Sequence, residues 1–346
     1  MKVAIDTSPL KTGHRLRGVG FYTKSLIENL PKIDRNNEYI FFDDGTVPSC
    51  NLVHYPYFDL YFNTLSSKQK IPFVVTIHDL IPLVFPELFP VGIRGKFNFW
   101  RQKKALKFAS RIICDSQCSK IDVIKYLNFD PNLVDVVYLA PSDDYKVLEK
   151  EDCLDIKQKY DLPDDFILYV GDVNYNKNLV NLILAMNKID STLIMVGSAL
   201  VDNSLNEVRE LVSQMRKSGV SRKIRRLGFV ENEDLVKIYN LATCYIQPSL
   251  YEGFGLPVVE AMACGTPVVI SKNSSLEEVA KDVGFFVNAQ DYDSIAKGVN
   301  KVLDLKINNS KNFDLLRKKS IEQSAKFTWE KTVKMIINSY IKALNV

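Results

Sequence analysis

The 346-residue sequence lacks a strong charge of either sign. Its 45 Lys and Arg residues nearly balance 41 Asp and Glu residues, which leaves a net charge of +4. A nucleic-acid-binding protein normally carries a concentrated excess of basic residues, so we expect no nucleic-acid partner. The 46% hydrophobic and 25% charged residues are typical of a folded globular protein and exclude a disordered or fibrous chain.

Cysteine and histidine are scarce and scattered. The six cysteines form no Cys-x-x-Cys pair, and only three histidines occur. We therefore expect neither a zinc site nor a disulfide framework, no metal and no cofactor, and buried free thiols in a reducing compartment. Residues 1–5 also lack the pattern of a signal peptide, which favours a cytoplasmic location.

Long hydrophobic runs are missing too. The apolar runs are far shorter than the roughly 18 residues that span a bilayer, so we predict no transmembrane helix. Short β-branched and aromatic runs instead alternate with longer amphipathic stretches, which indicates parallel sheets with crossover helices. The expected strands are residues 3–5, 39–42, 73–77, 111–114, 134–138, 166–170, 192–196, 223–227, 244–247 and 267–271.

The chain is too long for one ordinary domain, and its polar segment 141–165 is typical of a linker. We predict a boundary near residue 150 and two doubly wound, Rossmann-like α/β domains that face a cleft, residues 1–150 and 151–326. A closing helix over 327–346, capped by Thr328, is expected to pack on the first domain.

A loop and a short helix follow the expected strand 244–247. Pro257 suits the first helical position and Gly265 suits the position just past the end, so we expect a helix over 256–264. Gly253 and Gly255 then lie just before the helix N-terminus, where backbone N–H groups and the helix dipole favour a phosphate. The segment is therefore a candidate diphosphate site.

Two glutamates, Glu252 and Glu260, enclose this segment. A carboxylate repels a phosphate, so each must face hydroxyl groups, which suits a ribose and a sugar ring. Alternatively, Glu252 is a surface residue of the loop and Glu260 is a partner of the helix dipole.

The segment from Glu252 to Glu260 resembles the E-x7-E motif of the family 4 retaining glycosyltransferases, and the likeness runs along nearly all of the chain. The resemblance implies the GT-B fold, with an acceptor-side first domain and a donor-binding second domain. It implies that Glu252 faces the donor sugar and diphosphate, that Glu260 binds the ribose, and that Phe254, Gly255 and Leu256 supply backbone contacts. The implied co-substrate is a nucleotide sugar, GDP-mannose or a UDP-sugar.

The segment from Gly171 to Lys177 is similar to the family's Gly-Arg-x4-Lys-Gly loop, in which an arginine and a lysine neutralise the diphosphate. The resemblance assigns that role to Lys177. Asp172 stands at the arginine position, so Arg225 or Arg226 would have to compensate. Lys177 could otherwise be a solvated lysine in an Asn-rich turn.

Three further motifs accompany the second domain. Phe229 and Val230 resemble the family's segment near the nucleotide base. The Asp-x-Asp sequence that begins at Asp291 is interpreted as a helix cap and not as a metal motif. Ser275 and Glu278 match a capping box.

The first domain offers His78 at the carboxyl end of the expected strand 73–77, followed by Asp79, which either orients the histidine or caps the following turn. The resemblance places His78 against the donor sugar; a structural histidine is the alternative. His54 is a weaker candidate for lining the acceptor cleft. The segment Arg17-Gly18-Val19-Gly20 resembles the family's glycine-rich first loop, and it lacks the full spacing of a dinucleotide-binding fingerprint, which disfavours a dehydrogenase.

Residues 94–111 contain seven basic residues, no acidic residue, and three aromatic side chains, Phe97, Phe99 and Trp100. Such a helix either lies on an anionic membrane at the inner face of the plasma membrane or packs its aromatic side chains inward. The basic residues are Arg94, Lys96, Arg101, Lys103, Lys104, Lys107 and Arg111.

These observations and the resemblance together predict a glycosyltransferase that moves a hexose from a nucleoside-diphosphate sugar to a glycan or lipid-linked glycan. Retention of configuration is implied by the resemblance alone. Glu252, His78 and Lys177 are the expected catalytic residues. A sugar-nucleotide epimerase or phosphorylase on the same fold, or a non-catalytic partner of a transferase, are the alternatives.

Overall fold

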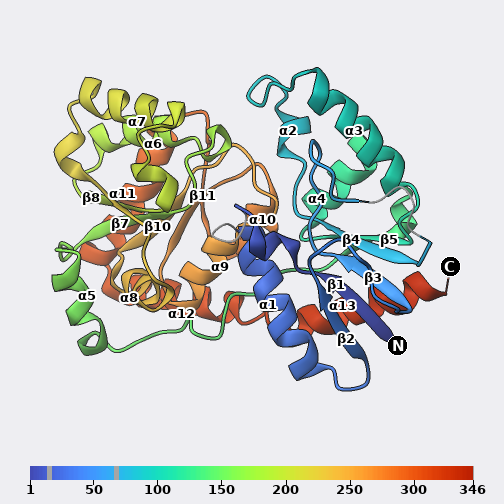
Figure 1. The fold of residues 1–346 in the computed structure, drawn as a ribbon. Helices are drawn as coiled ribbons and strands as arrows, with labels where there is room; N and C mark the ends of the chain where they lie inside the picture. Colours follow the sequence, from blue (N-terminus) through green and yellow to red (C-terminus); the bar gives the residue numbers. More distant parts are fainter. Residues whose placement is uncertain (14–17, 66–69, 346) are drawn as a thin grey trace. The chain divides into compact units, whose positions relative to one another are not determined.

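The computed structural model describes residues 1–13, 18–65 and 70–345. The chain divides into two compact units (Figure 1). Unit 1 comprises residues 1–140 and 328–346, and unit 2 comprises residues 141–327. The division therefore falls after Ala140, ahead of the position near residue 150 that the polar linker suggested, and the last helix returns to unit 1.

Unit 1 is built on a parallel six-stranded sheet with the order β2-β1-β3-β4-β5-β6. The central strands are buried on both faces, as expected of a parallel sheet that is covered by helices on both sides. The strands are β1 (Lys2–Asp6), β2 (Glu38–Phe42), β3 (Leu52–Tyr55), β4 (Phe73–Ile77), β5 (Arg111–Cys114) and β6 (Val134–Val136).

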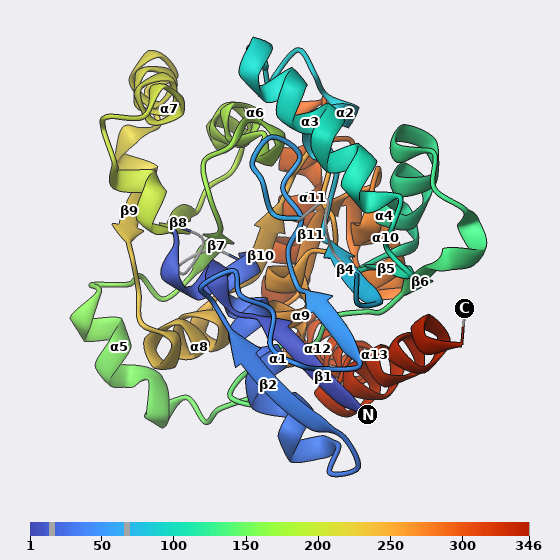
Figure 2. The same cartoon turned by 45° about the vertical axis from the view of Figure 1, so that its right-hand side comes forward.

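The last helix of the chain packs within unit 1, where it contacts the first long helix and strands β4 and β5 (Figures 1 and 2). Thr328 caps it by accepting a hydrogen bond from the backbone N–H of Lys331, as predicted. The helices of unit 1 are α1 (Gly18–Ile33), α2 (Ile81–Val84), α3 (Ile93–Leu106), α4 (Gln117–Asp122) and α13 (Trp329–Leu344).

Unit 2 repeats the architecture with the strand order β12-β11-β10-β7-β8-β9, again all parallel. Its strands are β7 (Phe166–Val170), β8 (Thr192–Val196), β9 (Ile224–Gly228), β10 (Cys244–Gln247), β11 (Val268–Ser271) and β12 (Phe285–Val287). Its helices are α5 (Leu154–Lys159), α6 (Leu179–Ala185), α7 (Asn206–Lys217), α8 (Asn232–Leu241), α9 (Leu256–Ala263), α10 (Ser275–Ala280), α11 (Tyr292–Asn308) and α12 (Ser310–Ser324).

All ten expected strands are present, with ends that shift by at most two residues. Two short strands, β3 and β12, were not predicted. Among the described helices, none combines the length and apolarity needed to cross a membrane.

The strand order of unit 2 reverses between β7 and β10, which lie side by side. From β7 the chain moves outward to β8 and β9, and from β10 it moves to β11 and β12 on the other side. The loops that follow β7 and β10 therefore diverge at the carboxyl edge of the sheet, where doubly wound domains bind their ligands.

Candidate functional site

The loops that follow β7 and β10 are locked together by two asparagines, Asn176 and Asn178. The Asn176 amide donates to the carbonyl of Tyr251 (3.1 Å), and the carbonyl of Asn176 accepts from the N–H of Leu250 (2.7 Å). The Asn178 amide donates to the carbonyls of Pro248 (2.9 Å) and Ala289 (2.6 Å). The side chain between them, that of Lys177, is thereby held at the switch point.

Lys177 forms a buried ion pair with Glu252. Its ammonium donates to both carboxylate oxygens, at 2.7 and 2.9 Å, and the two side chains are only 18% and 9% exposed. The hydroxyl of Ser249 donates to the same carboxylate at 2.6 Å. Lys177 is thus not the solvated lysine of the alternative interpretation, and the structure brings together the two residues that the motifs singled out.

The segment between Glu252 and α9 approaches its neighbours closely. Gly255, the residue before the helix, has φ of +100°, and a Cβ at this position would overlap Leu276, so both strain and space favour glycine. Pro257 lies in the first turn, as predicted, and helix α9 ends at Ala263 with Cys264 as its cap. Gly253, Phe254 and the N-terminus of α9 therefore lie directly beside the ion pair in sequence.

The expected capping box at Ser275 is wrong. The residue that precedes helix α10 is Ser274, and its side chain makes no capping hydrogen bond. The hydroxyl of Ser275 instead lies 2.9 Å from the carbonyl oxygens of both Glu252 and Phe254. A residue that we interpreted as a helix cap thus supports the loop that carries Glu252.

Glu260 lies one turn inside α9 and accepts a hydrogen bond from the hydroxyl of Tyr239 at 3.0 Å. Burial raises the pKa of Glu260 to about 7, although the Tyr239 hydroxyl opposes the shift. Burial, followed by the charge of Glu260, also raises the pKa of the nearby Tyr145. A carboxylate in this setting gains from hydroxyl donors, such as those of a ribose, that stabilise its charged form.

The ends of β7 and β8 meet through two glycines. The N–H of Gly171 donates to the carbonyl of Val196 (2.9 Å), and a Cβ on Gly197 would overlap the carbonyl of Gly171. Asp172 directs one carboxylate oxygen at the N–H of Val173 (2.8 Å), which closes the turn locally. The position of the expected arginine is therefore occupied by a turn-forming side chain.

Both arginines proposed to compensate for Asp172 form hydrogen bonds with backbone carbonyls outside the loop from Gly171 to Lys177. Arg225 donates to the carbonyls of Tyr160 and Asp161, and Arg226 donates to the carbonyl of Leu200 at 2.7 Å.

Phe229 and Val230 follow β9, where Phe229 is half exposed and Val230 is buried. Asp291 caps α11 through the N–H of Asp293, as predicted.

In unit 1, His78 stands at the carboxyl end of β4 with hydrogen-bond partners on both ring nitrogens. Nε2 lies 3.0 Å from the carbonyl of Pro56, which can only accept, so this nitrogen carries a proton. Nδ1 lies 2.6 Å from the Asp115 carboxyl group, and the edge of the His78 ring meets the ring of Tyr22. The residue that orients His78 is therefore Asp115, while Asp79 accepts from the N–H of Ile81.

His78 and Asp115 form a buried pair in which each side chain shifts the pKa of the other. Burial lowers the pKa of His78, but the charge and hydrogen bond of Asp115 more than offset this, so the pKa of His78 is raised. Burial also raises the pKa of Asp115, against the opposing effect of His78. Within the described residues, the second oxygen of Asp115 is buried without a hydrogen-bond partner.

His54 does not line a cleft, contrary to our expectation. It is fully buried in β3, where Nδ1 lies 2.7 Å from the Tyr340 hydroxyl and Nε2 lies 2.8 Å from the Thr76 hydroxyl. Burial lowers its pKa to about 3, so it is a neutral core residue. Gly18 and Gly20 form the first turn of α1 and not a loop before it, and Arg17 lies outside the described residues.

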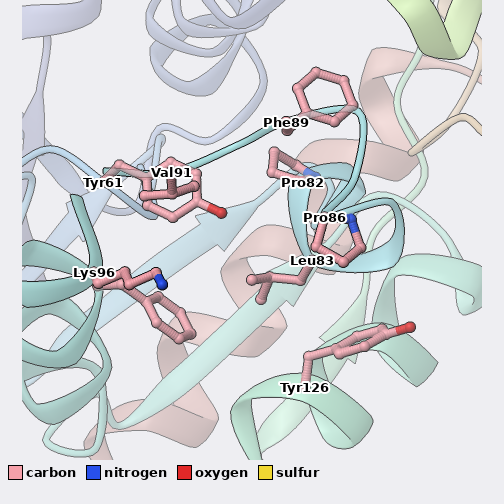
Figure 3. Close-up of a pocket in the computed structure, with 9 residues that line it drawn as sticks. Tyr61, Pro82, Leu83, Pro86, Phe89, Val91, Lys96 and Tyr126 are labelled. Carbon is pink, nitrogen blue, oxygen red and sulfur yellow. The ribbon is translucent and has the colours of Figure 1, made fainter. Parts of the chain in front are cut away.

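A pocket of about 510 Å³ opens in unit 1 beside α2 and α3 (Figure 3). Its lining is mostly apolar, and it includes Lys96 and Phe99 of the basic segment 94–111 but no residue of the candidate donor site. The residues around it are Tyr61, Pro82, Leu83, Pro86, Phe89, Val91, Lys96, Phe99 and Tyr126.

No group of three or more His, Cys, Asp or Glu side chains suited to a metal ion is found in the part of the chain that the structure describes. Sequence reasoning missed Asn176, Asn178, Ser249 and Asp115. The Asn-rich turn around Lys177 was visible in the sequence, but whether an asparagine is solvated or bridges two loops depends on contacts about 70 residues away.

Two parallel six-stranded α/β units, with helices around each sheet, define the class of the GT-B glycosyltransferases. Solved structures agree on the fold. Sucrose-phosphate synthase from Thermosynechococcus elongatus matches with a TM-score of 0.79 and 18% identity over 99% of this chain and 98% of that chain. HepE from Anabaena, solved with UDP and glucose, matches with a TM-score of 0.74 and 19% identity over 99% of both chains.

The family follows from sequence comparison. A family model described as Glycosyl transferases group 1 matches residues 154–326, and one described as Glycosyltransferase Family 4 matches residues 47–140. The O-antigen chain mannosyltransferase B of Escherichia coli is 30% identical over 269 residues, which are 77% of this chain and 69% of that protein. The serotype-specific mannosyltransferase WbdA of E. coli is 30% identical over 280 residues, 78% of this chain but 33% of that protein. The chain therefore belongs to glycosyltransferase family 4.

Proposed function

We propose that this glycosyltransferase moves a hexose, with mannose as the leading candidate, from a nucleoside-diphosphate sugar to a glycan or lipid-linked glycan. The observation that supports the proposal is the buried Lys177–Glu252 ion pair at the switch point of unit 2, next in sequence to the N-terminus of α9. A cation, a carboxylate and a helix N-terminus together suit a ligand that carries both a diphosphate and sugar hydroxyls.

In the proposed reaction, the bond between the sugar C1 and the diphosphate oxygen breaks while a bond forms between C1 and an acceptor hydroxyl oxygen. The proton of the acceptor hydroxyl passes to the departing phosphate. Lys177 and the N–H groups at the start of α9 stabilise the charge that develops on the leaving diphosphate. The acceptor enters from the face that the diphosphate leaves, which retains the configuration at C1.

The remaining positions have assigned roles in this proposal. Glu252 accepts hydrogen bonds from donor-sugar hydroxyls, and Glu260 accepts them from the ribose. Backbone groups of Phe254, Gly255 and Leu256 contact the donor. In unit 1, the role that the resemblance gives His78 requires Nε2 to exchange the Pro56 carbonyl for a donor-sugar hydroxyl, while Asp115 holds Nδ1 as the orienting residue.

The proposal of mannose rests on the two mannosyltransferases of E. coli that resemble this chain at 30% identity. GDP-mannose is therefore the first donor to test, and the UDP-sugars come next, since HepE was solved with UDP-glucose. Retention of configuration rests on the E-x7-E resemblance.

A thermal-shift screen against GDP-, UDP-, ADP- and dTDP-sugars tests donor binding. A ligand that binds only the folded state stabilises it by about 2.7 kcal/mol at a hundredfold excess over its Kd, so the true donor should raise the Tm. Stabilisation by no nucleotide sugar would favour the non-catalytic alternative, and turnover of the donor without an acceptor would favour an epimerase.

Lys177→Ala should lower transfer by about 10²- to 10³-fold, because one stabilising donor is removed from the developing charge. Lys188→Ala is the matched control, since Lys188 is a half-exposed lysine of the same unit that pairs with Asp293. The measurement is kcat/KM with the donor found in the screen. Equal activity of the two variants would contradict the proposed site.

A further inference from the structure

Helix α3 turns an apolar ridge toward solvent. Ile93, Phe97 and Trp100 are 89%, 57% and 59% exposed, and their spacing of four and three residues places them on one face of the helix. The opposite face carries Gln102, Ala105 and Leu106, which are buried. A surface helix usually presents charged residues to solvent and apolar residues to the core. The ridge of α3 departs from this pattern because its apolar side chains face solvent.

Cations border the ridge on both sides. Helical geometry places Arg94 and Arg101 along one side and Lys96 and Lys107 along the other, while Lys104 continues the ridge. The Lys104 ammonium lies 5.5 Å from the centre of the indole ring of the ridge, and α3 contains no acidic residue. All charged side chains on the ridge face of α3 are therefore positive.

Two of the seven basic residues and one of the three aromatic residues do not belong to this face. Arg111 is buried in β5 in an ion pair with Asp135, and the ammonium of Lys103 donates to the carbonyl of Tyr126. Phe99 lies on another side of the helix from the ridge and lines the apolar pocket together with Val91. The inward-packing alternative thus holds for Phe99 but not for the exposed ridge.

We propose that α3 docks this enzyme onto an anionic lipid bilayer. The ridge side chains enter the hydrocarbon boundary, and the flanking cations meet the headgroups. An apolar ridge flanked by cations favours a bilayer over a nucleic acid. The phosphates of a nucleic acid would pair with the cations but would leave the ridge side chains in water. The pocket adjoins the Lys96 side of the helix and extends the apolar surface there.

Trp100 is a built-in reporter of docking. The sequence contains two tryptophans, and the other, Trp329, is 7% exposed and lies in α13. Vesicles of phosphatidylglycerol added to the full-length protein should shift the emission of Trp100 to shorter wavelength, while phosphatidylcholine vesicles should not. Trp100→Phe keeps the apolar ridge, so it should still sediment with the anionic vesicles but should lose the spectral shift.

Two variants separate the apolar and electrostatic contributions. Phe97→Ser combined with Trp100→Ser, and Arg101→Glu combined with Lys104→Glu, should each lower partitioning into anionic vesicles by about tenfold or more. Leu315→Ser combined with Lys318→Glu on α12 is the matched control, because both residues are exposed in unit 2. Equal sedimentation of all variants, or no sedimentation of the parent protein, would overturn the proposal.

The docking proposal is independent of the proposed transfer reaction. The α3 variants should keep the Tm of the parent protein and its stabilisation by the donor. Loss of vesicle binding by the α3 variants, with donor binding intact, would support docking without bearing on the transfer reaction. Failure of every nucleotide sugar to bind the parent protein would contradict the transfer reaction without bearing on docking.

Discussion

Glu260 carries a carboxyl group that folding has made harder to ionise. Burial raises its pKa from 4.5 to about 7, and its one hydrogen-bond donor in the described structure is the Tyr239 hydroxyl. Between these two pKa values the folded state binds more protons than the unfolded state. The stability of unit 2 therefore falls as the pH rises from about 4.5 to 7.

Glu260→Gln should abolish this pH dependence and raise the free energy of unfolding above pH 7 by up to about 3 kcal/mol. Urea unfolding at pH 5 and at pH 8 measures the effect. The same variant should weaken donor binding, because a carboxylate is a stronger acceptor for ribose hydroxyls than an amide. A variant that keeps the pH dependence would show that another group titrates.

At the scale of residues, the sequence allowed site residues to be predicted where a motif specified both a backbone turn and a charged side chain. Lys177 and Glu252 were both predicted, and they form one ion pair although 75 residues separate them. Ser249 and Asp115 were not predicted, because serine and aspartate at strand ends have many roles. Only the fold shows that Ser249 reaches Glu252 and that Asp115, rather than Asp79, reaches His78.

At the scale of elements, helix α10 supports the loop before α9. The Ser275 hydroxyl lies within hydrogen-bond distance of two carbonyls of that loop, and the close approach of Leu276 to Gly255 holds the two segments together. The position of Glu252 thus depends on a helix that lies outside the E-x7-E segment in the sequence but contacts it in the fold.

Ser275→Ala should lower the free energy of unfolding by about 1–2 kcal/mol and weaken donor binding, since two buried carbonyls lose their shared donor. Ser274→Ala is a matched control one residue away, because the Ser274 hydroxyl is buried without a hydrogen-bond partner among the described residues. Urea unfolding and calorimetric titration of the donor measure both effects. Similar losses in the two variants would contradict the supporting role.

Elements were predictable from the sequence when they carried a clear pattern of β-branched and aromatic residues. Strand β3 was missed because it contains His54, which we interpreted as a site residue; the equally short and buried strands β5, β10 and β11 were predicted. Strand β12 was missed because it has only three residues. The burial that makes His54 neutral comes from tertiary contacts, which local sequence does not record.

At the scale of the whole molecule, the chain leaves unit 1 after Ala140 and returns to it at Thr328. Helix α13 completes the core of unit 1, where the Tyr340 hydroxyl meets Nδ1 of His54 across 286 residues of sequence. Because the pKa of His54 is lowered to about 3, the unfolded chain binds the extra proton below about pH 6.5. The stability that neutral His54 contributes is fully present above that pH and is lost as the pH falls toward 3.

Tyr340→Phe should lower the free energy of unfolding of unit 1 by about 1–3 kcal/mol, because the buried Nδ1 of His54 loses its partner. Tyr292→Phe is the control, since Tyr292 is 39% exposed and begins α11 of unit 2. Scanning calorimetry with and without the donor should show that the variant unfolds earlier but is still stabilised by the donor, which we assign to unit 2. If the variant lost donor stabilisation while remaining folded, then most of the donor-binding free energy would come from unit 1, and the assignment of the main donor contacts to the Lys177–Glu252 site would be wrong.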